Sequence, residues 1–518
     1  MNNKAGKRKR SSFPIIPPTW ADVAALAGGL LLPLAFSPFN VFPLAVFSPA
    51  LLFVLWRDAS PGRAAFRGFL YGIGMFGLGV SWVYVSMHHY GNMPAPLAGL
   101  ATFLFVAGLS LYPSAAGWLQ ARFLSKHDSI SLTVVLPALW VLFEWIRGWF
   151  LTGFPWLNLG YSQVGSWLGG YASWCGVYGV SLFVAISAGL LAWAAHEPEK
   201  FFRRALPMFI AIWAGGWLAG KTEWVQPTGK PLRVSLIQGN VSLASKWRPE
   251  NRNAIIDRYF ALSAEAPKSD LIIWPEAAVP AYLDEIDSSY LANLRRISQA
   301  AHVDFLIGVV ERDKERRHYY NSVVSISPHP GIYRKRHLVP FGEYAPLEPL
   351  FSWLMKNLHI PMSDFSPGPT DQPPLFAAGQ KIGVSICYED AFGEEVIRDL
   401  PQATLLVNVS EDAWFGDSFA PHQRIEMARM RAREAGRPML RAANTGPSVV
   451  IDYRGNVIAR SPQFQTYVLS ASVQPMQGAT PYVRLGNITV VLASIVMIAV
   501  AGIRSSARLF RPGGSRTT

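Results

Sequence analysis

The sequence predicts a protein in two parts, an α-helical membrane domain of eight spans and a water-soluble α/β sandwich. Half of the 518 residues are hydrophobic and only 16% are charged, and the mean hydropathy is +0.20. Such a chain is too apolar to be wholly soluble and too charged to lie entirely within a bilayer. The long apolar segments all lie before residue 221 or after residue 484, and the residues between them alternate strand-like and helical patterns.

Eight apolar segments define the membrane domain. They are residues 21–36, 41–56, 68–86, 96–119, 131–149, 174–195, 205–220 and 485–503. Several come close to the roughly 20 residues that span a bilayer, and the first, second and seventh do so only with their flanks counted. In the third segment, Gly68 and Gly72, and Gly77 and Ser81, have the four-residue spacing that lets membrane helices approach closely. We therefore expect these small residues to lie in helix–helix contacts.

Basic residues predict that both ends of the chain lie in the cytoplasm. The clusters that flank the first and last segments are Lys4, Lys7, Arg8, Lys9 and Arg10, and Arg504, Arg508 and Arg511. The loops after the second, fourth and sixth segments are basic as well. This is the positive-inside pattern, and we prefer it to nucleic-acid binding as the explanation of the net charge of +13.

This orientation divides the chain into five parts. Residues 1–20 form a basic cytoplasmic N-terminus, residues 21–220 the membrane domain with spans one to seven, residues 221–484 an extracytoplasmic domain, residues 485–504 the eighth span, and residues 505–518 a basic cytoplasmic tail.

The extracytoplasmic segment has the element order of an α/β sandwich. Strands are predicted at 232–237, 271–274, 305–310 and 405–409, and helices at 251–262, 290–301, 391–400 and 423–434. Hairpins are predicted within 322–334 and 447–460. The chain has two cysteines, Cys175 and Cys387, which excludes a disulfide framework.

Cys387 is the candidate nucleophile. It ends a mostly apolar strand pattern and is followed by the helical pattern at 391–400. A cysteine at such a strand-to-helix turn has an exposed sulfur, and the first helical N–H groups favour its thiolate. The alternative is a small buried hydrophobe. Cys175, at the start of the sixth span, is interpreted as a packing residue.

Two further segments supply charged partners. Glu276 follows the apolar strand pattern 271–274 past Trp-Pro, so partial desolvation raises its pKa toward that of a general base. Its alternative role is a helix cap or a surface acid. Lys335 and Glu343 flank a Pro-Phe-Gly turn, where an ammonium can neutralise an oxyanion and a nearby acid can hold it in place. The alternative is a solvated basic loop.

Together these motifs resemble those of the nitrilase superfamily, whose Glu-Lys-Cys triad occurs in this chain order. Glu276 lies in LIIWPE, Lys335 in YRKRHLVPFGEY and Cys387 in GVSICYED. A nitrilase-like αββα sandwich between the last two of eight spans is similar to the apolipoprotein N-acyltransferase family of bacterial envelopes. The resemblance implies that Glu276 is the general base, Lys335 the oxyanion stabiliser and Cys387 the nucleophile that accepts the acyl group.

The same resemblance implies supporting residues. Glu343 stands beside the lysine, and Tyr388 and Glu389 follow the cysteine at positions that the family needs. Trp247 matches a tryptophan that contacts substrate, although ordinary packing is its alternative role. The stretch that contains Trp414 resembles a segment near the site, where Glu411 stands in place of an expected Asn.

The implied activity is transfer of an acyl chain from a membrane phospholipid to the N-terminal diacylglyceryl-cysteine of an apolipoprotein. The acyl group passes through a thioester on Cys387, with no cofactor and no metal. The implied location is the bacterial inner membrane, with the catalytic domain on the periplasmic face. The bilayer is a partner and nucleic acid is not. Two alternatives remain, a membrane-tethered amidase that uses water as the acceptor, and a transporter or scaffold with an inert outer domain.

Two other features complete the predictions. Glu144 and Arg147 lie three residues apart in the fifth span, where charges are costly and usually functional. They are either a helix-locking ion pair or a site near the lipid phosphate, for which Arg147 is the candidate. Residues 338–373 are predicted to be a mobile apolar lid, with packing on the core of the domain as the alternative.

Overall fold

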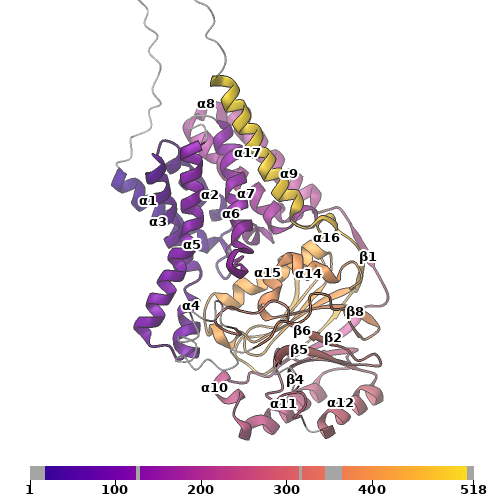
Figure 1. Ribbon diagram of the computed structural model, residues 1–518. Helices are drawn as coiled ribbons and strands as arrows, with labels where there is room; N and C mark the ends of the chain where they lie inside the picture. The colour runs from indigo at the N-terminus through magenta and orange to yellow at the C-terminus, as the bar shows by residue number, and fades with distance from the viewer. Residues whose placement is uncertain are drawn as a thin grey trace, which may run out of the picture.

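The computed structural model describes residues 18–123, 129–286, 288–313, 315, 318–344 and 365–509. A helical region lies on one side of the molecule and an α/β sandwich on the other (Figure 1). The last helix, α17 (Ile488–Leu509), returns from the sandwich along the helical region. The basic N-terminal cluster and the central part of the predicted lid, residues 345–364, lie outside the described residues.

Each of the eight predicted apolar segments contains a helix. These helices are α1 (Pro18–Leu31), α2 (Leu44–Trp56), α3 (Pro61–Gly79) with α4 (Trp82–Val85), α5 (Ala95–Phe123), α6 (Leu136–Arg147), α7 (Ala172–His196), α9 (Leu206–Ala219) and α17. A one-turn helix, α8 (Pro198–Lys200), joins α7 to α9.

Length and composition allow fewer membrane crossings than eight. Within the described residues, two helices are long and apolar enough to cross a membrane, Ala95–Phe123 and Trp167–His196. A third is added if Pro61–Gly79 and Trp82–Tyr90, which meet at a bend of 52°, are taken as one crossing. Thr19–Ala35, Leu44–Trp56 and Ile488–Ile503 are shorter apolar helices. The structure therefore gives a helical region with two or three candidate spans.

The small residues of α3 behave as predicted at Gly68 and Gly72 but not at Gly77. A Cβ on Gly68 would lie 2.4 Å from the carbonyl oxygen of Pro113 in α5, and one on Gly72 would lie 2.6 Å from Cα of Ser110. These glycines therefore permit the close contact between α3 and α5. The prediction is wrong for Gly77, because within the described residues no atom of a neighbouring element lies within 4 Å of its Cβ position.

The α/β part contains two six-stranded sheets packed face to face. Their strand orders are β12-β11-β10-β9-β8-β7 and β13-β2-β3-β4-β5-β6. The strands are β2 (Leu232–Gln238), β3 (Leu271–Ile273), β4 (Asp304–Asp313), β5 (His318–Ile326), β6 (Ile332–Arg334), β7 (Leu375–Ala377), β8 (Gln380–Ile386), β9 (Leu405–Ser410), β10 (Met439–Ala443), β11 (Val449–Ile451), β12 (Val457–Arg460) and β13 (Tyr467–Val473). A separate pair, β1 (Val225–Pro227) and β14 (Met476–Gly478), connects the sandwich to the helical region.

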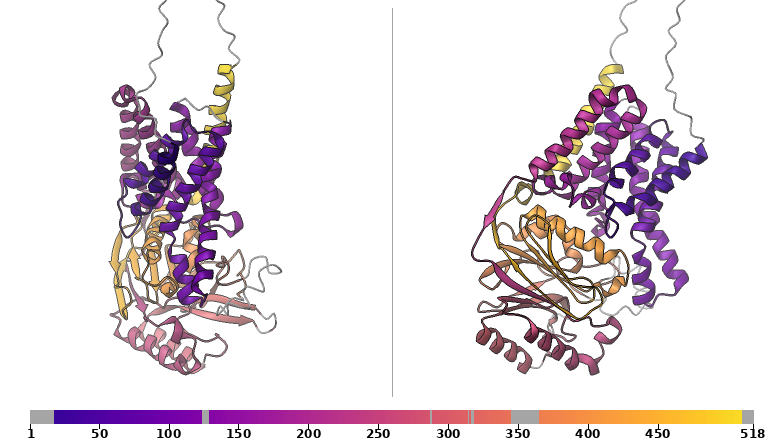
Figure 2. Two further views of the ribbon diagram at one scale, coloured as in Figure 1. Left: turned by 90° about the vertical axis from the view of Figure 1, so that its left-hand side faces the viewer. Right: turned by 180° about the vertical axis from the view of Figure 1, so that it is seen from behind.

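Helices cover both outer faces of the sandwich. α10 (Leu243–Lys246), α11 (Arg252–Glu265) and α12 (Ser288–Ala301) lie on the side away from the helical region. The opposite face carries α14 (Gly393–Val396), α15 (Ala420–Ala435) and α16 (Pro481–Leu485), and α15 lies between the sheet and the helical region (Figure 2). The core between the sheets contains alternate strand residues such as Ile273, Leu306, Val384 and Val407. The predicted αββα layering is therefore correct.

Among the elements predicted in the sandwich, the helix at 391–400 is wrong. A 3₁₀ turn at Cys387–Ala391, the four-residue α14 and a second 3₁₀ turn at Ile397–Asp399 replace it. Phe392 interrupts the helix with extended dihedrals, φ −102° and ψ 95°, and its ring stacks on His337 at 3.9 Å between centroids. This tertiary contact overrides the local helical preference.

Candidate active site

The two sheets bring the predicted catalytic residues to one edge of the sandwich. β2, β3 and β4 run parallel to one another, as do β8, β9 and β10. Glu276 follows the carboxyl end of β3, and Cys387 follows the carboxyl end of β8. The carboxyl ends of parallel strands are where open α/β sheets place their sites.

Cys387 occupies a strained turn. Its φ of +50° lies in the left-handed region, which is uncommon for residues other than glycine. The side chain is buried, with 9% exposure. Burial raises the pKa of the Cys387 thiol to about 11, and the charge of Glu276 acts in the same direction, whereas Arg424 and Lys335 oppose it. The expectation of an exposed sulfur at the start of a regular helix is therefore wrong, because the side chain is buried and a 3₁₀ turn follows β8. The raised pKa favours the protonated thiol, which calls for a nearby base.

Glu276 is a buried carboxyl group with both oxygens occupied. Asn321 donates from Nδ2 to Oε1 at 2.7 Å, and the backbone N–H of Glu411 donates to Oε2 at 2.7 Å. Burial raises the pKa of Glu276, and the nearby Lys335 opposes that rise. A buried carboxyl group with a raised pKa, close to a protonated thiol, has the properties of a general base.

Lys335 follows β6 and points its ammonium group into the same region. Nζ lies 2.8 Å from Glu343 Oε1 and 3.9 Å from Glu276 Oε1. Burial alone would lower the pKa of Lys335, but Glu343, Glu276 and Cys387 outweigh it, so the pKa is raised and the group stays charged. Glu343 also accepts from the backbone N–H of Val339 at 2.8 Å, which fixes it beside the lysine. The arrangement provides one positioned cation for an oxyanion.

Glu389 joins the lysine segment to the cysteine turn. Its Oε1 accepts from the backbone N–H groups of Arg336 and His337, at 2.6 and 3.1 Å, and its Oε2 accepts from that of Ile386 at 2.6 Å. The Tyr333 hydroxyl donates to the same carboxylate. One buried carboxylate therefore sets the distance between two catalytic segments.

Tyr388 turns away from the triad toward the helical region. Its hydroxyl donates to the carbonyl of Gly153 at 2.9 Å, and its ring stacks on Trp156 with centroids 6.3 Å apart. The residue after the nucleophile is thus anchored to the loop between α6 and α7.

The two predicted substrate-binding tryptophans, Trp247 and Trp414, lie in different surroundings. Trp247 is half-buried against the cluster that contains Ala277, directly after Glu276. Trp414 is half-buried, and its carbonyl accepts from the Ser86 hydroxyl at 2.8 Å.

Arg147 is buried, and its guanidinium donates to the carbonyls of Phe154 and Trp156 and to Oδ1 of Asn158. Glu144 instead accepts from Trp140 and from the backbone of Leu159. The two charges therefore bind separate partners in the described structure, and Arg147 holds the loop after α6.

Three residues near the site have no counterpart in the sequence predictions, namely Asn321, Lys246 and Arg424. Asn321 bridges Glu276 and Glu343. Lys246 forms an ion pair with Glu411 at 2.5 Å, and both side chains are buried. Arg424 contacts the sulfur of Cys387. Glu411, which stands in place of an expected Asn, thus has a buried cation as its partner. In the sequence, Glu411 itself and Lys246 directly before Trp247 were the two features that could have predicted this ion pair.

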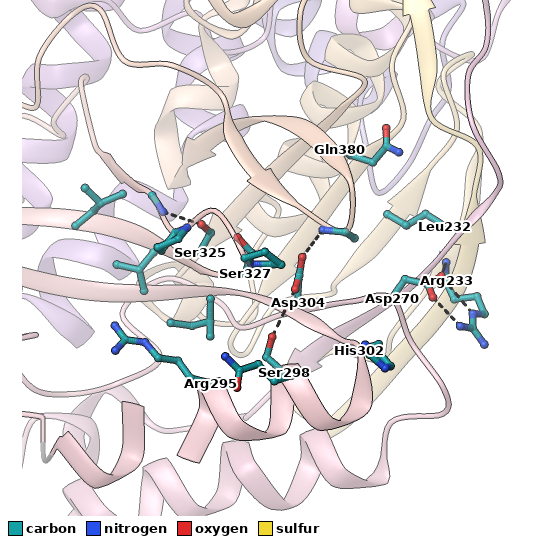
Figure 3. Close-up of a pocket in the computed structure, with 18 of the residues that line it drawn as sticks. Leu232, Arg233, Asp270, Arg295, Ser298, His302, Asp304, Ser325, Ser327 and Gln380 are labelled. Carbon is teal, nitrogen blue, oxygen red and sulfur yellow. Dashed lines mark hydrogen bonds and ion pairs between the residues drawn. The ribbon is translucent and has the colours of Figure 1, made fainter. Parts of the chain in front are cut away.

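A large cavity lies elsewhere. It has a volume of about 1320 Å³ and is lined by the starts of β2 and β4, the end of β5 and residues of α12 (Figure 3). Leu232, Asp304, Arg295 and Gln380 are among its lining residues, and none of the predicted site residues lines it. The cavity is therefore at the opposite strand ends from Cys387. Within the described residues, no group of three or more His, Cys, Asp or Glu side chains is arranged to hold a metal ion.

Comparison with known proteins identifies the family. Residues 28–190 match the apolipoprotein N-acyltransferase N-terminal domain, and residues 233–482 match the carbon-nitrogen hydrolase family. The apolipoprotein N-acyltransferase of Methylococcus capsulatus is 45% identical over 489 residues, which cover 94% of this chain and 97% of that one. The enzyme of the same name from Nitrosomonas europaea is 46% identical, with 93% and 96% covered.

Among solved structures, a carbon-nitrogen hydrolase from Helicobacter pylori G27 matches 54% of this chain and 99% of its own, at 16% identity and a TM-score of 0.36. The similarity to the two acyltransferases, by contrast, runs through both the helical region and the sandwich. The chain belongs to the apolipoprotein N-acyltransferase family.

Proposed function

We propose that this chain transfers an acyl chain from a membrane phospholipid to the α-amino group of a diacylglyceryl-cysteine at the N-terminus of an apolipoprotein. The observation that carries the proposal is the position of Glu276, Lys335 and Cys387 at one edge of a sandwich that rests on apolar helices. Family membership supplies the classes of donor and acceptor.

The first half of the reaction loads the enzyme. Glu276 takes the thiol proton, and the Cys387 sulfur attacks the ester carbonyl carbon to form a C–S bond. Lys335 faces the oxyanion of the tetrahedral intermediate, held there by Glu343. The C–O bond then breaks, the leaving oxygen takes the proton from Glu276, and a lysophospholipid departs.

The second half returns the enzyme to its starting state. The acceptor amine attacks the thioester carbon while Glu276 takes a proton from the nitrogen. The C–S bond breaks, an amide forms and the Cys387 sulfur regains a proton. The burial of all three triad side chains limits access of water to the thioester and so favours transfer to an amine over hydrolysis.

The membrane topology is part of the proposal. Eight spans, with both chain ends in the cytoplasm, place residues 221–484 on the periplasmic face of the inner membrane, between spans seven and eight. The described part of the fold supports this division, because α8 and the C-terminal half of α17 both lie at the end of the helical region away from the sandwich (Figure 1). We count the shorter apolar helices, together with their flanking turns, among these eight spans.

Intact mass spectrometry after exposure to phospholipid without an acceptor tests the reaction. We expect Cys387 to gain the mass of one acyl chain. When a diacylated lipopeptide is then added, the enzyme should lose that mass and the lipopeptide should gain it. Steady release of fatty acid without an acceptor would instead indicate the amidase-like hydrolase. Absence of any adduct on folded protein would indicate a transporter or scaffold.

A further inference from the structure

Arg424 contacts the nucleophilic atom itself. It lies in α15 with 1% exposure, and its Nη1 is 3.2 Å from Sγ of Cys387. The same nitrogen donates to the Ser410 hydroxyl at 2.9 Å. Nη2 donates to the carbonyl of Cys387 and to Oδ1 of Asp390 at 2.8 Å. The guanidinium is therefore oriented toward both the sulfur and the backbone of the nucleophile.

The charges around the sulfur come from several elements. Glu276 after β3 and Asp412 after β9 disfavour the thiolate, whereas Lys335 after β6 and Arg424 in α15 favour it. The charge of Asp412 is offset by Arg441 of β10, which donates to both of its oxygens at 2.7 and 2.9 Å. Burial would lower the pKa of Arg424, but Asp390, Cys387 and Asp412 outweigh it and raise the pKa. Arg424 therefore stays a cation throughout the working pH range.

The two cations near the sulfur are held by different carboxylates. Glu343 holds the Lys335 ammonium at 2.8 Å, and the proposed mechanism assigns that ammonium to the substrate oxyanion. Arg424 reaches the sulfur from α15 and is held by Asp390. A hydrogen bond to the charged form of a group stabilises that form, and a bond from a cation is stronger than one from a neutral donor.

We infer that Arg424 is a second catalytic cation, which stabilises the Cys387 thiolate when the proton moves to Glu276 and again when the C–S bond of the thioester breaks. The inference rests on the proposed acyl transfer for its second role. In the first step the S–H bond breaks, its electron pair stays on sulfur beside the guanidinium, and the proton moves to the Glu276 carboxylate. In the last step the C–S electron pair returns to the same sulfur.

The position of Arg424 is fixed from the helical region. Its neighbour Gln423 accepts from Trp156 Nε1 at 2.6 Å and donates to the carbonyl of Gly79 at 3.0 Å. Glu426 accepts from the backbone N–H of Ser37 at 3.0 Å. One face of α15 is thus anchored to the membrane helices while another presents a cation to the nucleophile, so the donor is preorganised for the reaction.

Alkylation of the full-length protein in detergent tests the inference. In a Cys175→Ala background Cys387 is the sole thiol, and its reaction with iodoacetamide reports the thiolate fraction at each pH. A loss of one pKa unit of stabilisation slows alkylation about tenfold at any pH below the thiol pKa. We expect Arg424→Gln to slow alkylation at pH 8 by about tenfold or more, and acylation by phospholipid to fall in parallel.

Arg437→Gln is the matched control. Arg437 is equally buried and donates to the carbonyls of Ala403 and Gly478, without a contact to the sulfur. The Arg437→Gln substitution should leave the dependence of the Cys387 alkylation rate on pH unchanged. Arg424→His replaces Arg424→Gln if the glutamine variant does not fold. At pH 9, where its imidazole is neutral, Arg424→His should also slow alkylation about tenfold or more.

Unchanged alkylation in a folded Arg424 variant would overturn the inference, as would equal slowing by Arg437→Gln. Iodoacetamide does not require acyl transfer, so this result is separate from the proposed function. A wild-type protein that alkylates normally but takes no acyl group from phospholipid would refute the proposed function and leave the assignment of Arg424 to the thiolate intact.

Discussion

Replacing Glu389 by Gln tests whether one buried carboxylate sets the distance between the lysine segment and the nucleophile turn. The substitution keeps the shape but converts one acceptor oxygen into an NH₂ donor. At the Oε2 position that donor would face the Ile386 N–H, and at the Oε1 position it would face those of Arg336 and His337. At least one buried N–H group then loses its acceptor in either orientation.

The cost follows from these contacts. An unsatisfied buried donor destabilises a protein by about 1–3 kcal/mol. If the lysine segment and the turn at Cys387 separate by about 1 Å, the rate of acyl-enzyme formation falls on the order of 100-fold. We therefore expect Glu389→Gln to lower the melting temperature while the protein still folds. In that folded variant, thioester formation from phospholipid should be slower by on the order of 100-fold.

Glu395→Gln is the matched control, because Glu395 accepts from His337 Nδ1 at 2.8 Å and an amide oxygen can accept the same bond. Thermal unfolding and time-resolved intact mass measure the two effects. The reasoning is refuted if Glu389→Gln forms the thioester within about twofold of the wild-type rate, or if Glu395→Gln is equally slow.

Three further predictions follow from other contacts. Cys387→Ala should abolish the hydroxylamine-labile acyl adduct, and Cys175→Ala should retain it, because the Cys175 thiol donates to the Tyr171 carbonyl within the helical region; an adduct in Cys387→Ala would contradict the thioester mechanism. Arg147→Gln should reduce the yield of folded protein and its acylation by phospholipid together, because Arg147 donates to three protein acceptors. Size-exclusion chromatography measures the yield and adduct mass measures the acylation. Loss of acylation at full yield would instead support the role near the lipid phosphate. Lys246→Met should lower the free energy of unfolding by about 3–5 kcal/mol, because it leaves the buried Glu411 carboxylate without its cation. Adding Glu411→Leu should recover much of that loss in a double-mutant cycle measured by thermal unfolding, and additive losses would contradict the pairing.

The sequence predicted the layered architecture because short apolar runs bounded by turn residues alternate with longer helical patterns. The apolar runs at 271–274 and 405–409 became buried central strands, and the turn residues between 326 and 331 joined an antiparallel pair. The triad was predictable for a related reason, since Glu276 and Cys387 end strands at the same edge of the sandwich. Chain order and strand polarity carried both predictions.

The buried polar contacts were not predictable in this way. Helix α15 contains Arg424, Glu426, Arg431 and Glu434, a composition typical of an exposed helix, yet all four are buried. Three of them have partners far away along the chain: Ser37 for Glu426, Val177 for Glu434 and Cys387 for Arg424. Arg431 and Glu434 also pair with each other on the helix. Such pairings depend on how two parts of the molecule meet, which local periodicity does not encode. The broken helix after Phe392 has the same origin, a tertiary contact with His337.

The position of α15 between the sandwich and the helical region restricts how this architecture can be recombined. A catalytic domain transplanted from a relative that differs at about half of its positions would bring an α15 fitted to other loops. The graft would have to include the matching acceptors and donors near Ser37, Trp156 and Val177. The two parts therefore do not exchange as independent modules, and substitutions on this helix have to be inherited together with those of the loops beneath it.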